Sequence, residues 1–173
     1  LCASTTGSWN TASGSYALYA TTTGSQNTAT GWKALCNNTS ASYNTAYGAC
    51  TLFANTTGAL NTAVGFKALA ANITGNCNTA SGYKALQTNT TGDNNTSIGG
   101  ESGLVLTTGD YNIALGQNST HSGTGVNREI VIAYDETGKG SDTAFLDGSS
   151  GVFNKANATA WSQTSDRRIK KNI

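Results

Sequence analysis

The 173-residue sequence has no proline, no methionine and one histidine, and only 11% of its residues are charged. The net charge of +1 gives no electrostatic footprint for nucleic acid or for an anionic membrane surface. No apolar run reaches the length of a transmembrane helix, and no signal peptide is recognisable. We therefore expect neither nucleic-acid binding nor membrane insertion.

Motifs for catalysis are also missing. His121 is alone in a Ser/Gly-rich stretch, where we expect a solvated side chain. The acidic residues Asp135, Glu136 and Asp142 favour a solvated turn over a cation site. The glycines recur with a fixed period and do not precede a helix, so they form no phosphate-binding loop. The sequence predicts no enzyme, no cofactor and no metal site.

What the sequence does contain is a five-residue motif, Asn-Thr-Ala-x-Gly, that returns every 17 residues without insertion or deletion, with degenerate copies at 95–99 and 112–116. Leucine and glycine columns keep the same interval, and Leu1 falls in the leucine column, so we expect further coils before it. Such a fixed period is typical of a solenoid, in which each unit is one coil of a stack. The ladder residues are Asn10, Asn27, Asn44, Asn61, Asn78, Asn95 and Asn112, with Leu18, Leu35, Leu52, Leu69 and Leu86.

Each coil is predicted to hold two short strands joined by turns that contain glycine. Residues that favour strands are common, whereas Glu, Gln and Met are scarce. The alternation within one unit predicts that Asn61 and Ala63 face one way and that Thr62 and Val64 face the other. We expect the second strand near the Ala-Leu pair at 68–69.

The apolar content of one coil is small: one leucine, one or two alanines and often one aromatic residue. Burial of a large side chain contributes about 1.5–3 kcal/mol, which barely competes with roughly 1–2 kcal/mol of backbone ordering per residue. We therefore expect several chains to share one core in a closed assembly, namely a homotrimer. The predicted fold class is an all-β parallel β-solenoid or β-roll, intertwined or packed as a homotrimer and followed by a small β neck.

The distribution of charge predicts a boundary near Gln117, because seven of the ten basic residues and six of the nine acidic residues follow it. Before Gly92 the only charges are three lysines in one column, which we expect to face solvent: Lys33, Lys67 and Lys84. Strands are expected at 129–134, 143–146 and 151–154, with a turn at 135–140. The predicted regions are a seven-coil shaft at 1–117, a β neck or cap at 118–160 and a C-terminal segment from 161 to 173.

The cysteines do not form a disulfide framework. Cys2 and Cys36 share a column two coils apart, roughly 9.5 Å from the strand spacing, which exceeds the limit of about 7 Å between bridged Cα atoms. Cys50 and Cys77 fall in other columns, and no Cys-x-x-Cys pair is present. We expect buried or semi-buried free thiols.

Asparagine forms a second column, in which each residue begins an Asn-x-Ser/Thr sequon. In a eukaryotic secretory pathway this column would carry a row of surface glycans, whereas in a phage protein these are turn residues, which we favour. For the first asparagine column we likewise favour stacked amide hydrogen bonds over ion or sugar binding. The candidate glycosylation sites are Asn38, Asn55, Asn72 and Asn89.

The terminal string TSDRRIKKNI, residues 164–173, resembles the opening of the endosialidase-type intramolecular chaperone domain found at the C-terminus of phage tail fibres and tailspikes. The resemblance implies trimerisation of the preceding β-fibre and release of the chaperone by self-cleavage. Carried over to this sequence, the scissile bond would be Ser165-Asp166. The ladder also resembles, in architecture, the β-roll heads of trimeric adhesins of the YadA type.

These observations predict a structural and adhesive segment of a viral tail fibre or receptor-binding fibre, located on a virion or outside the cell. The expected partners are sister chains in a homotrimer and a host-surface glycan or other receptor. Candidate residues for sugar stacking are Trp9, Trp32 and Tyr43, together with the acidic loop from Asp135 to Asp142.

Two alternatives remain open. One is a cell-surface trimeric adhesin or extracellular filament subunit. The other is an ice-binding β-solenoid, in which threonine columns present a flat array of hydroxyl and methyl groups. Against ice binding, Ile73 interrupts the column of Thr56, Thr90 and Thr107, and the lysine column places charge on the coils.

Overall fold

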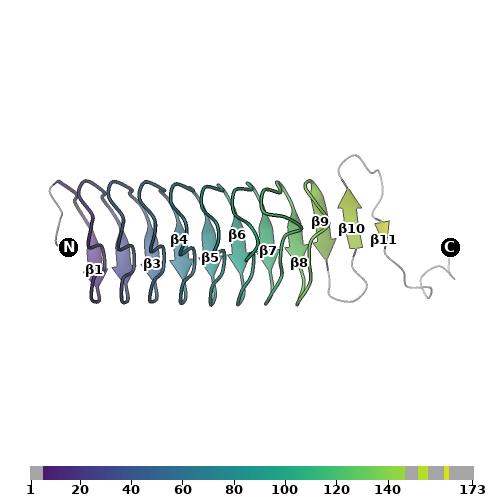
Figure 1. The fold of residues 1–173 in the computed structure, drawn as a ribbon, viewed down its shortest axis with the longest axis horizontal. Helices are drawn as coiled ribbons and strands as arrows, with labels where there is room; N and C mark the ends of the chain where they lie inside the picture. The colour runs from purple at the N-terminus through teal and green to yellow at the C-terminus, as the bar shows by residue number, and fades with distance from the viewer. Residues whose placement is uncertain (1–5, 147–151, 156–161, 164–173) are drawn as a thin grey trace.

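A computed structural model describes residues 6–146, 152–155 and 162–163, and it shows a stack of coils joined by one continuous sheet (Figure 1). The sheet has 11 strands in sequence order. The strands are β1 (Thr11–Ser13), β2 (Thr28–Thr30), β3 (Thr45–Tyr47), β4 (Thr62–Val64), β5 (Thr79–Ser81), β6 (Thr96–Ile98), β7 (Ile113–Leu115), β8 (Ile130–Ile132), β9 (Thr143–Leu146), β10 (Val152–Lys155) and β11 (Ser162–Gln163).

Strands β1 to β8 pair in parallel, and each residue lies opposite the residue 17 positions later, as Ala46 lies opposite Ala63. Within β4 the central Ala63 is buried, whereas Thr62 and Val64 are exposed. Asn61, directly before the strand, is also buried. The predicted parallel β-solenoid and the predicted alternation of faces are therefore confirmed.

The second strand predicted for each coil is absent from the described residues. The Ala-Leu segment forms a turn instead, because the leucines have left-handed backbone angles, with φ of +49° at Leu52 and +50° at Leu69. This segment still bonds to the next coil, since the Leu52 N–H donates to the Ala68 carbonyl oxygen at 3.1 Å. Each coil therefore has one short strand. At the place of the predicted second strand, backbone hydrogen bonds between turns join each coil to the next.

The interior of the stack is filled by one chain. Each ladder leucine is fully buried, and these leucines form one continuous apolar cluster with the strand alanines. The expectation that a coil needs neighbouring chains to bury its leucine is therefore wrong. The count of apolar side chains per coil did not include the backbone: a leucine in a narrow coil is covered by the backbones of its own coil and of the coils on both sides. Trimerisation remains a prediction that rests on the C-terminal resemblance.

The first asparagine column forms a continuous hydrogen-bonded ladder inside the stack. The Asn61 side-chain N–H donates to the Gly75 carbonyl oxygen at 2.8 Å, and its Oδ1 accepts the Asn78 backbone N–H at 2.9 Å. The next coils repeat this arrangement, with Asn78 bonded to Gly92 and Asn95 in the same two ways. Each asparagine therefore ties its own coil to the next.

The second asparagine column lies inside the same stack and meets the same glycine column. Asn72 Nδ2 donates to Asn55 Oδ1 at 2.8 Å and to the Gly75 carbonyl oxygen at 2.9 Å. The Gly75 oxygen thus accepts amides from both columns, and a Cβ at Gly75 would lie 2.4 Å from Asn72 Oδ1. An added methyl group at Gly75 would crowd the Asn72 amide. Another coil accommodates alanine in this column, since the Ala41 carbonyl oxygen accepts the side-chain amides of Asn27 and Asn38.

This packing corrects the alternative of a surface row of glycans. All four sequon asparagines are completely buried, and the nitrogen atoms that would carry a sugar donate hydrogen bonds inside the coil. A glycan on these amides is incompatible with the folded stack. The buried residues are Asn38, Asn55, Asn72 and Asn89.

The stack continues past the boundary expected near Gln117. Strand β8 pairs with β7 with Ile130 opposite Ile113, and Glu129 takes the ladder position after Asn112, whose Oδ1 accepts the Glu129 N–H at 2.9 Å. Strand β9 then pairs in parallel with β8. The 17-residue period therefore extends one coil further than predicted. Charge increases there without a break in the coil, because within residues 118–146 the charged residues other than Glu129 lie at least partly at the surface: Arg128, Asp135, Glu136, Lys139 and Asp142.

The end of the sheet matches the strand predictions made from sequence. Strand β9 coincides with the expected run at 143–146, β8 lies within the run expected at 129–134, and β10 is shifted by one residue from the run expected at 151–154. Strands β10 and β11 are antiparallel to their neighbours, so the parallel stacking ends at β9.

Candidate functional site

An aromatic–lysine strip runs along one side of the stack. In three coils an aromatic residue is followed directly by lysine, in the same two columns of the repeat. Each lysine Nζ lies over the neighbouring ring, at 4.6, 5.4 and 4.9 Å from the ring centroid. The strip consists of Trp32-Lys33, Phe66-Lys67 and Tyr83-Lys84. The lysines are only half exposed, because their stems lie against the rings.

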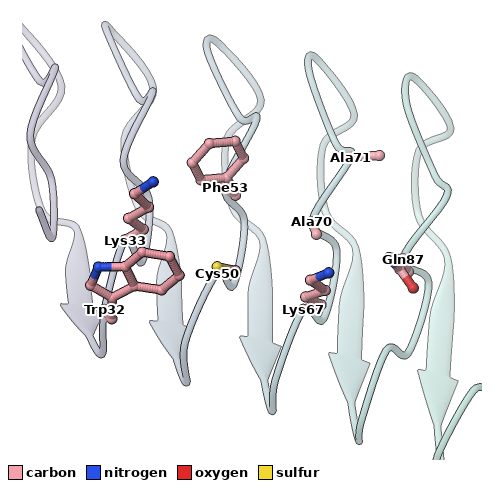
Figure 2. A pocket seen from close by; sticks show the side chains of 8 residues that line it. All are labelled: Trp32, Lys33, Cys50, Phe53, Lys67, Ala70, Ala71 and Gln87. Atoms are coloured by element: carbon pink, nitrogen blue, oxygen red, sulfur yellow. The ribbon is translucent and has the colours of Figure 1, made fainter.

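The strip is interrupted where Ala49 and Cys50 occupy the aromatic and lysine positions. A hollow of about 340 Å³ opens at this interruption. Figure 2 shows it across four successive coils, with the rings of Trp32 and Phe53 at one end and Lys67, Ala70, Ala71 and Gln87 toward the other. Its lining includes Trp32, Lys33, Cys50, Phe53, Lys67 and Gln87.

Charges along the strip differ between its two ends. Lys84 Nζ lies 3.5 Å from Glu101 Oε1. The pKa of Lys84 is raised above its usual value, mainly by its interaction with Tyr83 and to a smaller extent by Glu101. No salt bridge involves Lys33 or Lys67 within the described residues. The two lysines at the hollow are therefore open to an anion from solvent, whereas Lys84 already has an acidic partner.

The three residues predicted to stack on sugars do not form one site. Trp9 and Tyr43 are exposed in a shared column two coils apart, with Gln26 between them. Trp32 lies in the strip column and contributes to the hollow. The sequence reasoning missed Phe53 and the lysines, although the repeated aromatic-lysine dipeptide was a usable signal.

The acidic loop forms local surface contacts. Asp142 pairs with the Arg128 side chain, which lowers the pKa of that carboxyl group. Asp135 accepts a hydrogen bond from the Asn118 side chain. Among the described residues, no group of His, Cys, Asp or Glu has the arrangement of a metal site. Whether this loop contacts a sugar remains a prediction.

His121 is buried, contrary to the expectation of a solvated side chain. Only 1% of it is exposed, and neither ring nitrogen has a hydrogen-bond partner among the described residues. Close by in sequence, the buried Glu129 accepts hydrogen bonds from the backbone N–H groups of Ser122 and Gly140, at 2.9 and 2.5 Å. Burial lowers the pKa of His121, and the negative charge of Glu129 opposes this only in part.

A pH effect on stability follows from His121. Its pKa in the folded chain lies below the usual value of 6.5, so the unfolded chain binds the proton more readily. The neutral, buried side chain of His121 therefore makes its full contribution to the free energy of unfolding above about pH 6.5, and this contribution is lost as the pH falls below that value. We expect the melting temperature to drop by several degrees between pH 8 and pH 5.5, as measured by circular dichroism. His121→Leu should reduce that drop, whereas an equal drop in the variant would contradict this role.

The remaining predicted features are placed as follows. Cys36 is buried, which raises the pKa of its thiol, Cys50 is half-buried and Cys77 is exposed, so one of the three is more open than expected. These three are free thiols. The proposed scissile bond, Ser165-Asp166, lies outside the described residues. In the described part of the chain, no helix has the length and apolar character needed to cross a membrane.

These observations define the class of the protein: it is a β-solenoid repeat protein whose eight parallel coils carry a hollow between aromatic rings and lysines. Comparison with known proteins does not narrow this class. No protein-family model matches the chain, and searches of curated proteins and of solved structures likewise return no match.

Proposed function

We propose that this chain is a structural and adhesive segment of a viral (phage) tail fibre or receptor-binding fibre. The proposed mechanical role, a stiff spacer, rests on the single row of eight coils linked by one sheet (Figure 1). At about 4.8 Å per coil, β1 to β9 span roughly 40 Å. Buried amide ladders fasten each coil to the next, which suits a stiff spacer.

The viral assignment is supported by residues 164–173 and their resemblance to a fibre chaperone. In this proposal three chains assemble through the chaperone, and the coils hold a binding surface away from the particle. Exposed apolar side chains recur along the outside of the stack, and they suit contacts with sister chains or with a receptor. A cell-surface adhesin, which would use the same architecture, remains the alternative function.

The expected solution state is a trimeric rod. Light scattering of the chain should give three times the chain mass, and electron microscopy should show an elongated particle. A folded monomer would count against the trimeric fibre. Deletion of residues 164–173 should reduce the yield of trimer, because the segment that resembles the chaperone would be missing.

Ice binding has one specific observation in its favour and one against it. A row of threonines lies along the outer sheet face, one per coil at β1 to β6: Thr11, Thr28, Thr45, Thr62, Thr79 and Thr96. The neighbouring row on the same face is irregular, because Tyr47, Val64 and Ile98 stand where a second threonine row would be needed. The sheet therefore lacks a regular two-row lattice, and the fibre function is the better supported.

A further inference from the structure

The hollow in the aromatic–lysine strip exists because one coil carries small residues where its neighbours carry large ones. Ala49 and Cys50 stand between Trp32-Lys33 on one side and Phe66-Lys67 on the other. On the following coil the lining is Ala70 and Ala71, so the space continues past Phe53. Figure 2 shows Trp32 and Phe53 at one end and Lys67 with the alanines at the other. The result is an elongated depression with apolar walls.

Two ammonium groups stand at this depression in fixed positions. Lys33 Nζ lies 4.6 Å from the centroid of the Trp32 ring and 5.9 Å from that of Phe53. Lys67 Nζ lies 5.4 Å from the centroid of Phe66. The ring contacts hold each cation near the surface and limit its rotamer freedom, which lowers the entropy lost when an anion binds.

The charge surrounding the depression has one sign. From residue 1 to residue 92 the sequence contains three lysines and no acidic residue. Two of those lysines line the hollow, and the third, Lys84, is paired with Glu101. The hollow therefore favours a ligand with negative charge.

We propose that the hollow binds a carboxylated polysaccharide. The ring of each acidic sugar has an apolar face that packs on Trp32 or Phe53, and its carboxylate pairs with Lys33 or Lys67. The elongated shape across neighbouring coils suits a chain of sugars more than a single compact anion. This proposal deepens the proposed function and rests on it, because it names the ligand class for the adhesive surface of the fibre.

Nucleic acid is the less suitable polyanion. A DNA strand carries one charge per 3.4 Å, and proteins that bind it place a dense series of cations along its backbone. The hollow has two unpaired lysines, separated by the coil that carries Cys50. Its rings and alanines instead match a ligand that alternates apolar faces with single charges.

The experiment measures binding of oligogalacturonate to the full chain by isothermal titration calorimetry. The matched probe is the methyl ester of the same oligosaccharide, which keeps the sugar backbone and removes the charge. We expect binding of the acid, weakened by salt, and binding of the ester that is at least about tenfold weaker. Equal affinity for the ester, or tighter binding of a single-stranded DNA oligonucleotide, would overturn the proposal.

Matched variants locate the site. Lys33→Gln combined with Lys67→Gln should weaken binding by about tenfold, whereas Lys84→Gln should change it by less than about twofold because Lys84 lies outside the hollow. Trp32→Ala should weaken binding, whereas Tyr111→Ala, at an exposed aromatic position outside the hollow, should not. Equal losses in the test and control variants would overturn the assignment. All five substitutions involve surface side chains, and circular dichroism verifies that each variant folds.

The outcome separates this inference from the fibre proposal. A trimeric rod that binds neither probe would overturn the hollow as a glycan site and leave the mechanical function in place. A monomer that binds oligogalacturonate through Lys33 and Lys67 would support the site and count against the trimeric fibre.

Discussion

Replacement of Asn61 by alanine is expected to lower the free energy of unfolding by about 2–4 kcal/mol, because two buried backbone groups each lose a hydrogen bond. The Gly75 carbonyl oxygen would lose one of its two amide donors, and the Asn78 N–H would lose its acceptor. Water does not replace these bonds, since Gly75 and Asn78 are both buried. Urea denaturation measures the loss.

Hydrogen exchange gives a local readout for the same variant. The amide proton of Asn78 should exchange much faster in Asn61→Ala than in the parent chain, while amides several coils away should change less. Thr62→Ala is the matched control, because Thr62 is exposed on the same strand, and it should change the free energy of unfolding by less than about 0.5 kcal/mol. If the two variants were equally stable, the ladder would not be the main fastening between coils.

The fold could be predicted from the sequence where a residue type has one physical role in a stacked coil. The fixed interval of the asparagines set the register, and the alternation at 61–64 set the two faces of the strand. Stacked amides were expected for the first asparagine column, whereas the Asn61 side chain bonds to backbone groups of the next coil, the Gly75 carbonyl oxygen and the Asn78 N–H. For the register and the strand faces, local pattern and global fold agree, as they do in consistent natural sequences.

The second strand could not be rejected from residue types alone. The strand predicted near Ala68-Leu69 rests on residue preferences, and these do not suggest a left-handed leucine, which costs roughly 1–2 kcal/mol. In the stack, Leu69 accepts φ of +50° because its side chain is then completely buried and its N–H still bonds to the Ala85 carbonyl oxygen at 3.0 Å. Tertiary burial overrides local preference at this position.

The candidate site was only partly predictable for a related reason. Trp32 could be selected as an aromatic residue, but the hollow beside it depends on Ala49 and Cys50 being small where other coils are large. Recognition of such a site requires the columns to be placed side by side with the sizes of their members. The burial of His121 was equally hidden, because the sequence suggested that the 17-residue period ended before it.

The neighbouring glycines Gly99 and Gly100 offer the sharpest test of how closely the coils approach. Gly99 has φ of +132°, and a Cβ there would lie 2.5 Å from the Gly116 carbonyl oxygen of the next coil. Backbone held on both sides by sheet pairing cannot move away, so Gly99→Ala combines backbone strain with a steric clash. We expect a loss of at least about 3 kcal/mol in the free energy of unfolding, or failure to accumulate as folded protein.

Gly100→Ala is the matched control one residue away. An added Cβ at Gly100 has only Gln117 Cγ within reach, at 3.9 Å, which is an ordinary contact. Because alanine reduces the conformational entropy of the unfolded chain, this variant should be neutral or more stable by about 0.4–1 kcal/mol. Thermal unfolding followed by circular dichroism compares the two chains directly. Equal stability of the two variants would mean that β6 and β7 are not stacked as closely as the shared sheet requires, since only at Gly99 does the next coil occupy the space of a side chain.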